Sequence, residues 1–208
     1  MNRSKALKQL DELAKFNINP RLAAEGWDDE WKTLIATLLS ARTHDSVAVV
    51  VADRLFKKYN SAEKLAKAPL KAVEHIVKPV NFYKNKARNV LGCAKGIVSL
   101  FHGVLPRDIN ELTRLPGVGR KTANVFLASL GVQAVGVDTH VARISRKLGW
   151  TKHINPVKVE KDLKRLFPEE RWRSINYILV KFGQSNRGKM EDAILEGIKG
   201  IGAKNRKI

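Results

Sequence analysis

Apolar residues recur at three- and four-residue intervals along almost the whole chain, which is the spacing of one face of an α-helix. The clearest run is Trp31, Leu34, Ile35, Leu38 and Leu39. A second helix is predicted over 47–59, and a longer one follows Phe82 and continues to Phe101. Residues 133–137 are short and extended, and no segment alternates apolar and polar residues for long enough to predict a strand. We therefore predict an all-α fold.

Residues that begin and end helices divide this pattern into separate elements. Side chains able to cap a helix N-terminus precede the predicted helices, namely Asp28 or Asp29, Ser61, Asp108, Asp138 and Asn155. Residues 116–119 interrupt the pattern, and a further helix is predicted over 120–130. Glycines follow predicted helix ends at Gly103, Gly131 and Gly183. No Gly/Ser-rich linker occurs, so any domain boundary is a crossing of the chain between compact helical lobes.

The chain carries a large positive charge. Its 208 residues give a formal net charge of +19 and a pI of about 10.2. Nucleic acid is the leading partner, because binding releases counterions from the phosphates. An anionic membrane surface would require an amphipathic anchor or a lipidation motif, and we find neither. An inert basic surface explains the charge equally well, so the motifs must decide.

Cys93 is the only cysteine, which excludes an internal disulfide and a cluster of thiolate ligands. It falls within the apolar pattern of a helix and is predicted to be a small core residue. Residues 1–5 lead into a mixed amphipathic stretch without a long apolar run, which argues against a signal peptide and a transmembrane span. These features predict an intracellular location, in the cytoplasm and nucleoid or in a nucleus.

A glycine turn between two helical patterns is the first feature that indicates chemistry. It is the run Leu115, Pro116, Gly117, Val118, Gly119, Arg120, Lys121, Thr122 and Ala123. Glycine tolerates positive φ and lets the backbone approach a ligand closely. The N–H groups that begin the next helix form an anion site, and Leu115 and Val118 would pack the turn from inside. Glycines alone suit an ordinary αα-corner, but Arg120 and Lys121 on a basic chain favour phosphate binding.

Two reactive side chains lie in or after this turn. Lys121 is in the first helical turn, where it either contacts phosphate or acts as a Schiff-base nucleophile. The positive end of a helix favours the neutral amine that attack on a sugar carbon requires. Asp138 could cap a helix, stabilise an oxocarbenium-like sugar or take a proton, and capping does not exclude catalysis. His140 fits an orienting hydrogen bond better than acid or base catalysis.

The run 115–123 followed by 137–140 resembles the helix–hairpin–helix and Gly/Pro…Asp signature of base-excision DNA glycosylases, in particular the endonuclease III family. Residues 38–45, LLSARTHD, resemble that family's early motif. Residues 82–87, FYKNKA, resemble its segment leading into the long helix. The similarity runs from about residue 5 to residue 183, and its motifs are specific in combination.

The resemblance implies two helical lobes with DNA bound in the groove between them. One would be a six-helix bundle of residues 23–131 ending in the hairpin, and the other would join residues 1–22 to 132–208. The damaged nucleotide would be rotated out of the stack into the groove. Lys121 matches the family's nucleophile, which attacks the sugar C1′, displaces the base and forms an imine that permits β-elimination. Asp138 matches the family's essential carboxylate.

The sequence departs from the family in two places. Most endonuclease III-like proteins end in a four-cysteine iron–sulfur segment, whereas 184–208 contain no cysteine. We therefore predict no cofactor, with a monovalent cation at the hairpin left open. A simple basic tail is favoured over a second glycine hairpin at 197–202, and it would hold DNA through Arg187, Lys189, Lys199, Lys204, Arg206 and Lys207. Arg42 stands where the family commonly has glutamine, and it would alter which opposite base is accepted or contact a phosphate.

These observations predict a base-excision repair DNA glycosylase with abasic-site lyase activity. It would act as a monomer on double-stranded DNA containing damaged bases or abasic sites, without a membrane partner. The resemblance implies oxidised pyrimidines as substrates; the alternatives are a mismatch-specific uracil or thymine glycosylase and a non-catalytic structural DNA-binding protein. The catalytic residues would be Lys121 and Asp138. The predicted DNA contacts are Arg42, Leu115, Gly117, Val118, Gly119, Arg120, Thr122 and His140.

Overall fold

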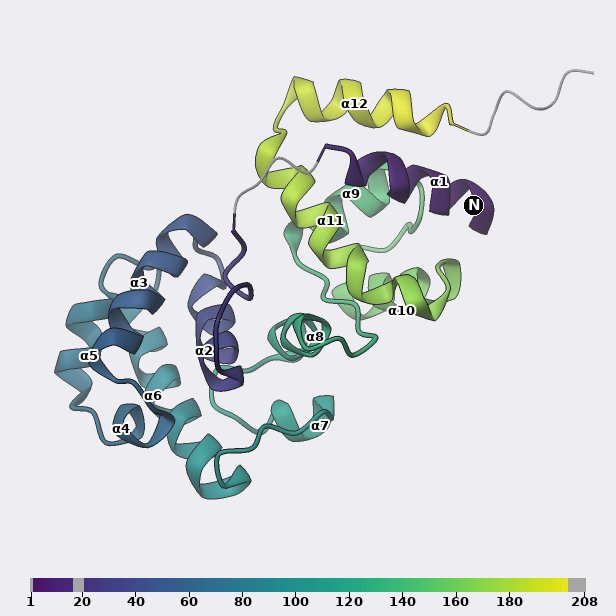
Figure 1. The fold of residues 1–208 in the computed structure, drawn as a ribbon. Helices are drawn as coiled ribbons and strands as arrows, with labels where there is room; N and C mark the ends of the chain where they lie inside the picture. The colour runs from purple at the N-terminus through teal and green to yellow at the C-terminus, as the bar shows by residue number, and fades with distance from the viewer. Residues whose placement is uncertain (1, 17–20, 202–208) are drawn as a thin grey trace, which may run out of the picture. The chain divides into compact units, whose positions relative to one another are not determined.

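The computed structural model describes residues 2–16 and 21–201, and the regular structure in this part of the chain is helical throughout (Figure 1). The helices are α1 (Arg3–Ala14), α2 (Glu30–Ser40), α3 (Asp45–Lys58), α4 (Ala62–Ala66), α5 (Leu70–Val77), α6 (Tyr83–Phe101), α7 (Ile109–Leu112), α8 (Arg120–Ser129), α9 (Thr139–Lys147), α10 (Pro156–Leu166), the 3-10 turn η1 (Glu169–Arg171), α11 (Trp172–Ser185) and α12 (Lys189–Lys199). The prediction of an all-α fold is confirmed, since these residues contain no strand.

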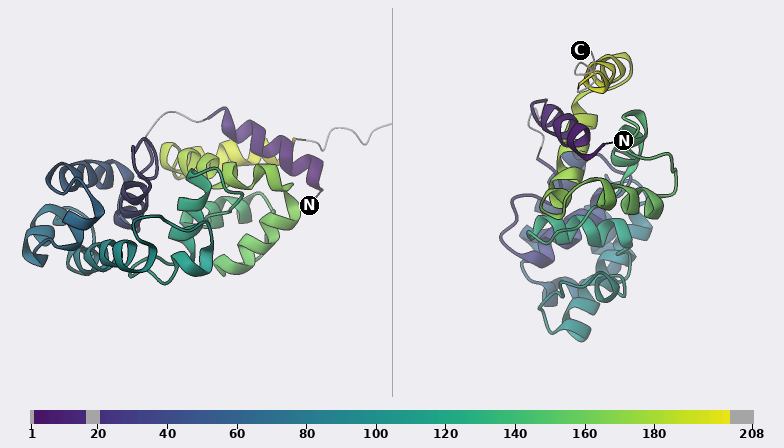
Figure 2. Two further views of the ribbon diagram at one scale, coloured as in Figure 1. Left: turned by 60° about the horizontal axis from the view of Figure 1, so that its bottom comes forward. Right: turned by 90° about the vertical axis from the view of Figure 1, so that its right-hand side faces the viewer.

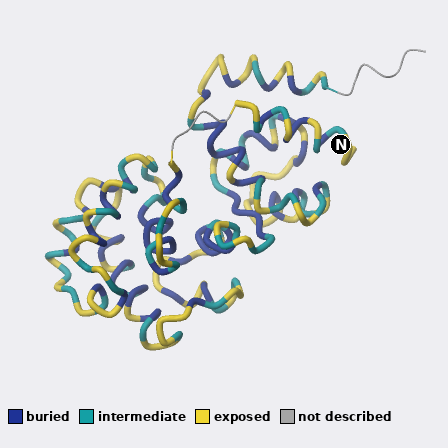
Figure 3. Tube along the Cα trace, in the orientation of Figure 1, coloured by how far each residue is buried: buried dark blue, intermediate teal, exposed yellow. Residues whose placement is uncertain are grey.

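The chain divides into two compact units. The hairpin unit consists of the described residues of 20–132 and contains α2 to α8. The terminal unit consists of the described residues of 1–19 and 133–208 and contains α1 and α9 to α12. Each unit has its own buried residues, as Figure 3 shows along the two parts of the trace, and each is considered by itself.

In the hairpin unit, α2 is the central element and packs against α3, α6 and α8. Its buried residues surround the helix axis: Trp31, Thr33, Leu34, Ile35, Ala36, Thr37, Leu38 and Leu39. A helix that is apolar on nearly all sides belongs in a core. The long helix α6 packs against α2, α4 and α5, so that α2 and α6 together form the support on which the hairpin rests.

Two glycines on α6 seat the segment that leads into the hairpin. A Cβ on Gly92 would lie 2.9 Å from Cβ of Pro116, and a Cβ on Gly96 would lie 2.5 Å from Cδ2 of Leu115. Larger residues at these two positions would therefore push the segment away from α6. The sequence of α6 in this way determines where the hairpin begins.

In the terminal unit, α11 packs against α1 and α9, and α1 also packs against α12. Figures 1 and 2 show α1 and α12 side by side, running in opposite directions. The buried amide of Gln9 on α1 connects them: its Nε2 donates to the carbonyl of Ile198 at 3.2 Å, and its Oε1 accepts from Nε1 of Trp150 at 2.8 Å. One side chain therefore joins α1, α12 and the segment that follows α9.

Most of the predicted caps are present, with one correction. The side chains that cap helices as predicted are Ser61, Asp108, Asp138 and Asn155. Gly103 and Gly131 have positive φ after α6 and α8. The prediction for Asp28 or Asp29 is wrong, because neither carboxylate caps α2. Both bind the ammonium of Lys32 instead, at 2.7 and 3.4 Å.

Two predictions near the C-terminus are wrong. Gly183 does not end a helix but lies buried within α11. Residues 189–199, predicted as part of a simple basic tail, form α12, while Lys204, Arg206 and Lys207 of that tail lie outside the described residues. Within residues 2–16 and 21–201, no helix has both the length and the apolar character needed to span a bilayer.

Candidate active site

The hairpin joins α7 to α8 through a turn that begins at Pro116. Gly117 has a φ of 78°, in the left-handed region, and a Cβ at this position would lie 2.6 Å from Cβ of Asn89 on α6. The backbone N–H of Val118 closes the turn by donating to the carbonyl of Leu115 at 3.1 Å. The backbone conformation and the neighbouring helix both require glycine at 117.

Gly119 is not required by the protein in the same way. Its φ is −88°, which any residue adopts. Apart from its chain neighbours, no atom of residues 2–16 and 21–201 lies within 4 Å of the position that its Cβ would take. The expectation of a positive φ therefore holds for Gly117 alone. The open space at the N-cap of α8 suits a group from outside that approaches the backbone closely.

The hairpin residues predicted to contact DNA differ in burial. The side chains of Leu115, Val118 and Thr122 are buried, so a ligand could reach only their backbone atoms. Arg120 is exposed and Lys121 is partly exposed, both in the first turn of α8. Two cationic side chains at the positive end of a helix dipole create a local potential that attracts anions.

Lys86 on α6 lies close enough to Lys121 for their charges to interact. The Lys86 side chain is buried, and its Nζ donates to the carbonyl of Leu39 at 2.6 Å and to Oγ1 of Thr43 at 2.8 Å. Burial, and to a lesser degree the charge of Lys121, lower the pKa of Lys86 to about 8. Lys86 is therefore a buried amine of the hairpin unit that can change its charge near pH 8.

Arg42 lies at the surface of the hairpin unit, just after α2. Its φ of 57° is left-handed, which is uncommon for a residue with a Cβ, and Nδ2 of Asn81 donates to its carbonyl at 2.6 Å. The backbone N–H of Asn81 donates at 3.1 Å to Oγ1 of Thr43, the hydroxyl that also binds Lys86. The guanidinium carbon of Arg42 lies 4.9 Å from the ring centroid of Phe82. One network therefore fixes both Lys86 and the backbone that presents Arg42.

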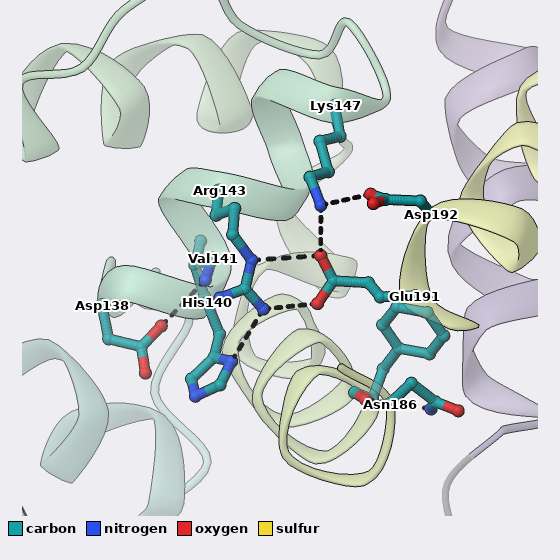
Figure 4. Close-up of polar contacts among 9 residues, drawn as sticks. Asp138, His140, Val141, Arg143, Lys147, Asn186, Glu191 and Asp192 are labelled. Carbon is teal, nitrogen blue, oxygen red and sulfur yellow. Dashed lines mark hydrogen bonds and ion pairs between the residues drawn. The ribbon is translucent and has the colours of Figure 1, made fainter. Parts of the chain in front are cut away.

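Asp138 begins α9 in the terminal unit (Figure 4). Its Oδ1 accepts from the backbone N–H of Val141 at 2.8 Å, which is the predicted capping bond. The residue is neither fully buried nor fully exposed, and the cap leaves the second carboxylate oxygen outside this bond. A carboxylate held in this way is oriented by its helix and can still act on a ligand.

His140 lies in the first turn of α9, with Nδ1 3.3 Å from Nη2 of Arg143 (Figure 4). Gly183 of α11 leaves room for the ring, because a Cβ there would lie 2.3 Å from Nδ1 of His140. Burial lowers the pKa of His140; the charge of Asp138 opposes this shift, and the charges of Arg143 and Arg187 add to it. A neutral ring whose Nδ1 faces a guanidinium fits an orienting role.

Two residues that contribute to these arrangements were not predicted. Lys86 lies four residues before the buried Val90 on α6, so helical spacing was a signal for its burial. Glu191 on α12 binds Arg143 and Lys147, and its side chain is 2% exposed. Its ion pairs join residues 48 and 44 positions apart, and no local pattern in the sequence indicates them.

The residues of this chain do not fit an iron–sulfur cluster. Cys93 is the one cysteine of the sequence and is buried in α6, and burial raises the pKa of its thiol to about 12. Four thiolates, the usual ligand set of such a cluster, are therefore not available in this sequence. Nowhere in residues 2–16 and 21–201 do three or more His, Cys, Asp or Glu side chains gather in a way that could hold a metal ion.

Comparison with known proteins gives close matches to one family. Residues 35–169 match the family described as HhH-GPD superfamily base excision DNA repair protein. Endonuclease III of Thermotoga maritima is 40% identical over 178 residues, 84% of this chain and 83% of the relative. Endonuclease III of a Synechocystis species is 40% identical over 154 residues, 73% of this chain and 70% of the relative.

A solved structure gives the same result in three dimensions. It is described as a trapped endonuclease III–DNA covalent intermediate in an estranged-adenine complex. It is 34% identical to this chain with a TM-score of 0.83, and the match covers 91% of this chain and 90% of the other. The chain therefore belongs to the HhH-GPD superfamily of base excision DNA repair proteins, as the motifs at 115–123 and 137–140 predicted. The matched segment contains Lys121 and Asp138 and ends before α12.

Proposed function

We propose that this chain is a bifunctional DNA glycosylase and abasic-site lyase, with Lys121 as the nucleophile and Asp138 as its carboxylate partner. The observation that carries the proposal is the amine of Lys121 in the first turn of α8, beside the buried amine of Lys86. Membership of the HhH-GPD superfamily and 40% identity to endonuclease III of Thermotoga maritima support it. A protein that only binds DNA would need neither an amine at 121 nor a carboxylate at 138.

The chemistry begins with attack by the neutral amine of Lys121 on C1′ of the damaged nucleotide. The glycosidic bond breaks and its electron pair leaves with the base. Loss of protons from the attacking nitrogen and opening of the sugar ring give an imine between Nζ and C1′. Removal of a proton from C2′ then expels the 3′ phosphate by β-elimination, and water releases the lysine. The Asp138 carboxylate stabilises positive charge on the sugar or takes a proton from the attacking amine.

The charge of Lys86 interacts with that of Lys121, the proposed nucleophile. Two ammonium groups whose charges interact repel each other, so the pair releases a proton at a lower pH than an isolated lysine would. The pKa of Lys86, about 8, is in line with this repulsion in addition to its burial.

The hairpin binds the backbone of the nucleic acid. The backbone N–H groups at the start of α8, the open space at Gly119 and the exposed Arg120 suit a phosphate of the DNA backbone. Double-stranded DNA with a damaged base is the proposed substrate. Its base is an oxidised pyrimidine, an assignment that rests on the resemblance to the endonuclease III family.

Borohydride trapping on a duplex with one abasic site tests the lyase step, because borohydride reduces the imine to a stable amine. Wild-type protein forms a covalent adduct with the DNA, and Lys121→Ala forms none. Lys95→Ala removes an exposed lysine of α6 in the same unit and keeps the adduct. An undiminished adduct in Lys121→Ala, or none in the wild type, contradicts the proposal.

Base release tests the glycosylase step and the role of Asp138. Asparagine also caps helices, so Asp138→Asn removes the charge and keeps a capping acceptor. We expect base release to fall by roughly 10²- to 10⁴-fold, with the helix content unchanged by circular dichroism. A panel of duplexes carrying an oxidised pyrimidine, or uracil or thymine opposite guanine, identifies the substrate. Preference for the mismatched bases would overturn the assignment to oxidised pyrimidines but not the chemistry.

A further inference from the structure

Glu191 is a buried carboxylate in the first turn of α12, the helix that follows the turn at Gly188. Its side chain is 2% exposed. One oxygen accepts from Nε of Arg143 at 3.1 Å and from Nζ of Lys147 at 2.7 Å, and the other accepts from Nη2 of Arg143 (Figure 4). Glu191 therefore accepts three hydrogen bonds from two charged groups, and such charge-assisted bonds are the strong ones.

The ion-pair cluster of Arg143, Lys147, Glu191 and Asp192 contains equal numbers of positive and negative groups. Lys147 also binds Oδ1 of Asp192 at 2.6 Å, so two cations on α9 face two carboxylates on α12. Burial alone would raise the pKa of Glu191, but the hydrogen bonds from Arg143 and Lys147 outweigh it, so the pKa lies below its ordinary value. Glu191 is therefore ionised at neutral pH and holds both cations.

The same arginine touches His140. Nη2 of Arg143 donates to Glu191 and lies 3.3 Å from Nδ1 of His140. Asp138 caps the helix that carries both residues, through Val141 at 2.8 Å. A displacement of Arg143 would therefore reach the first turn of α9, where the proposed carboxylate partner of the reaction lies.

The far end of α12 is also fixed. The carbonyl of Ile198 accepts from Gln9, whose amide is fully buried and also binds Trp150. Leu195 and Ile198 are buried as well. Because both ends of α12 are anchored, Glu191 presents its carboxylate to α9 from a fixed position.

We propose that Glu191 is a positioning residue, which holds Arg143 and through it the first turn of α9, with Asp138 and His140, in the geometry that the reaction needs. This inference rests on the proposed function, because it assigns Glu191 a part in the reaction of Asp138. It gives a task to α12, which lies beyond residues 35–169 of the family match.

Glu191→Gln tests the proposal, because it keeps the shape of the side chain and removes its charge. We expect kcat for base release to fall about 10-fold, as small displacements of a reacting group do, with KM for the duplex within about 2-fold. The resonances of the His140 ring shift in the same variant, since Arg143 loses its partner. Glu191→Asp, which restores the charge, recovers part of kcat. Glu196→Gln changes a carboxylate on the exposed side of α12 and leaves kcat and the His140 resonances unchanged.

A different result is expected if Glu191 only stabilises the packing of α12 against α9 and has no positioning role. Glu191→Gln would then lower only the melting temperature, with kcat and the His140 resonances as in the wild type, and the proposal would be overturned. If Glu191→Gln does not fold, Arg143→Lys takes its place, since it keeps the charge but removes the guanidinium between Glu191 and His140. An unchanged kcat and unchanged His140 resonances in that variant also overturn the proposal. Failure of the proposed function is recognised separately, because wild-type protein then releases no base although the His140 resonances still respond to Glu191.

Discussion

The hairpin unit and the terminal unit each hold cationic side chains next to a proposed reacting residue, and they accommodate the charge in opposite ways. Lys86 donates to a carbonyl and a hydroxyl, and the charge that acts on it is that of another cation, Lys121. Arg143 and Lys147 share the carboxylate of Glu191, and Lys147 binds Asp192 as well. The first arrangement leaves a buried positive charge unbalanced, whereas the second balances it.

The two arrangements move lysine pKa values in opposite directions. The pKa of Lys86 falls to about 8, chiefly through burial. The pKa of Lys147 rises above its ordinary value, through hydrogen bonds to Asp192 and Glu191. Burial against a carbonyl and a hydroxyl, close to a second cation, produces an amine that can change its charge near pH 8. Such an amine suits chemistry. Carboxylates keep the ammonium charged, which suits a fixed structural contact.

Reversing the charge of Glu191, the carboxylate shared by Arg143 and Lys147, should have the largest effect. Glu191→Lys places a third cation against Arg143 and Lys147 in a buried position, so we expect the free energy of unfolding to fall by about 3–5 kcal/mol. Urea denaturation measures the change. Glu196→Lys makes the same substitution on the exposed side of α12 and should cost less than about 0.5 kcal/mol. Equal losses in the two variants would show that the balanced cluster does not stabilise the terminal unit.

Raising the pH should affect the two lysines with opposite signs. The folded pKa of Lys86, about 8, lies below the ordinary 10.5, so the unfolded chain binds more protons between these values. Relative to Lys86→Met, the wild type should therefore gain about 3 kcal/mol of stability from pH 8 to pH 10.5. The folded pKa of Lys147 is raised, so its contribution is present below pH 10.5 and is lost as the pH rises further.

The titration of Lys86 can also be followed directly. In protein labelled with ¹³C at lysine Cε, one resonance should titrate near pH 8 and be missing from Lys86→Met. Its pKa should rise in Lys121→Met, since the charge of Lys121 is one cause of the shift. A Lys86 resonance that titrates near pH 10.5 would remove the contrast between the two units.

A smaller effect is expected at Gly119, where the uncharged backbone of the hairpin is proposed to bind a DNA phosphate. Gly119→Ala adds a methyl group in open space at an ordinary φ, so the free energy of unfolding should change by less than about 0.5 kcal/mol. If DNA approaches the backbone there, losing one hydrogen bond to a phosphate should weaken binding about 10-fold. Fluorescence anisotropy with an abasic duplex measures this. Unchanged affinity would mean that the space at Gly119 is not used.

Local signals were sufficient to predict the elements that carry the proposed reacting groups. Asp138 caps α9 through a residue three positions away, and the conformation of Gly117 follows from the turn it makes. Both signals lie within a few residues of the feature they determine. Their combination also carried the resemblance to the family to which the chain belongs.

The supporting residues depend on contacts that are distant in the sequence. Lys86 finds its acceptor 47 residues away at Leu39, and Arg143 meets Glu191 across 48 residues. Gly197 lies within α12, and Gly200 follows its last residue. The prediction of a simple basic tail, made in preference to a second glycine hairpin at 197–202, missed α12, which packs against α1 and forms ion pairs with α9.

The smallest effect is expected at His140, which lies in the first turn of α9 and contacts Arg143. Its folded pKa is lowered from 6.5, chiefly by burial. The unfolded chain therefore binds a proton first as the pH falls below 6.5, and stability decreases in that range. Relative to His140→Gln, the wild type should lose stability on acidification below pH 6.5, as measured by urea denaturation at a series of pH values. In Glu191→Gln this loss should be smaller, because Arg143, which disfavours the protonated ring more strongly than Glu191 favours it, moves away from His140 when its partner is removed. A larger loss in Glu191→Gln would indicate that Arg143 stays beside the ring without Glu191, against the positioning role proposed for Glu191.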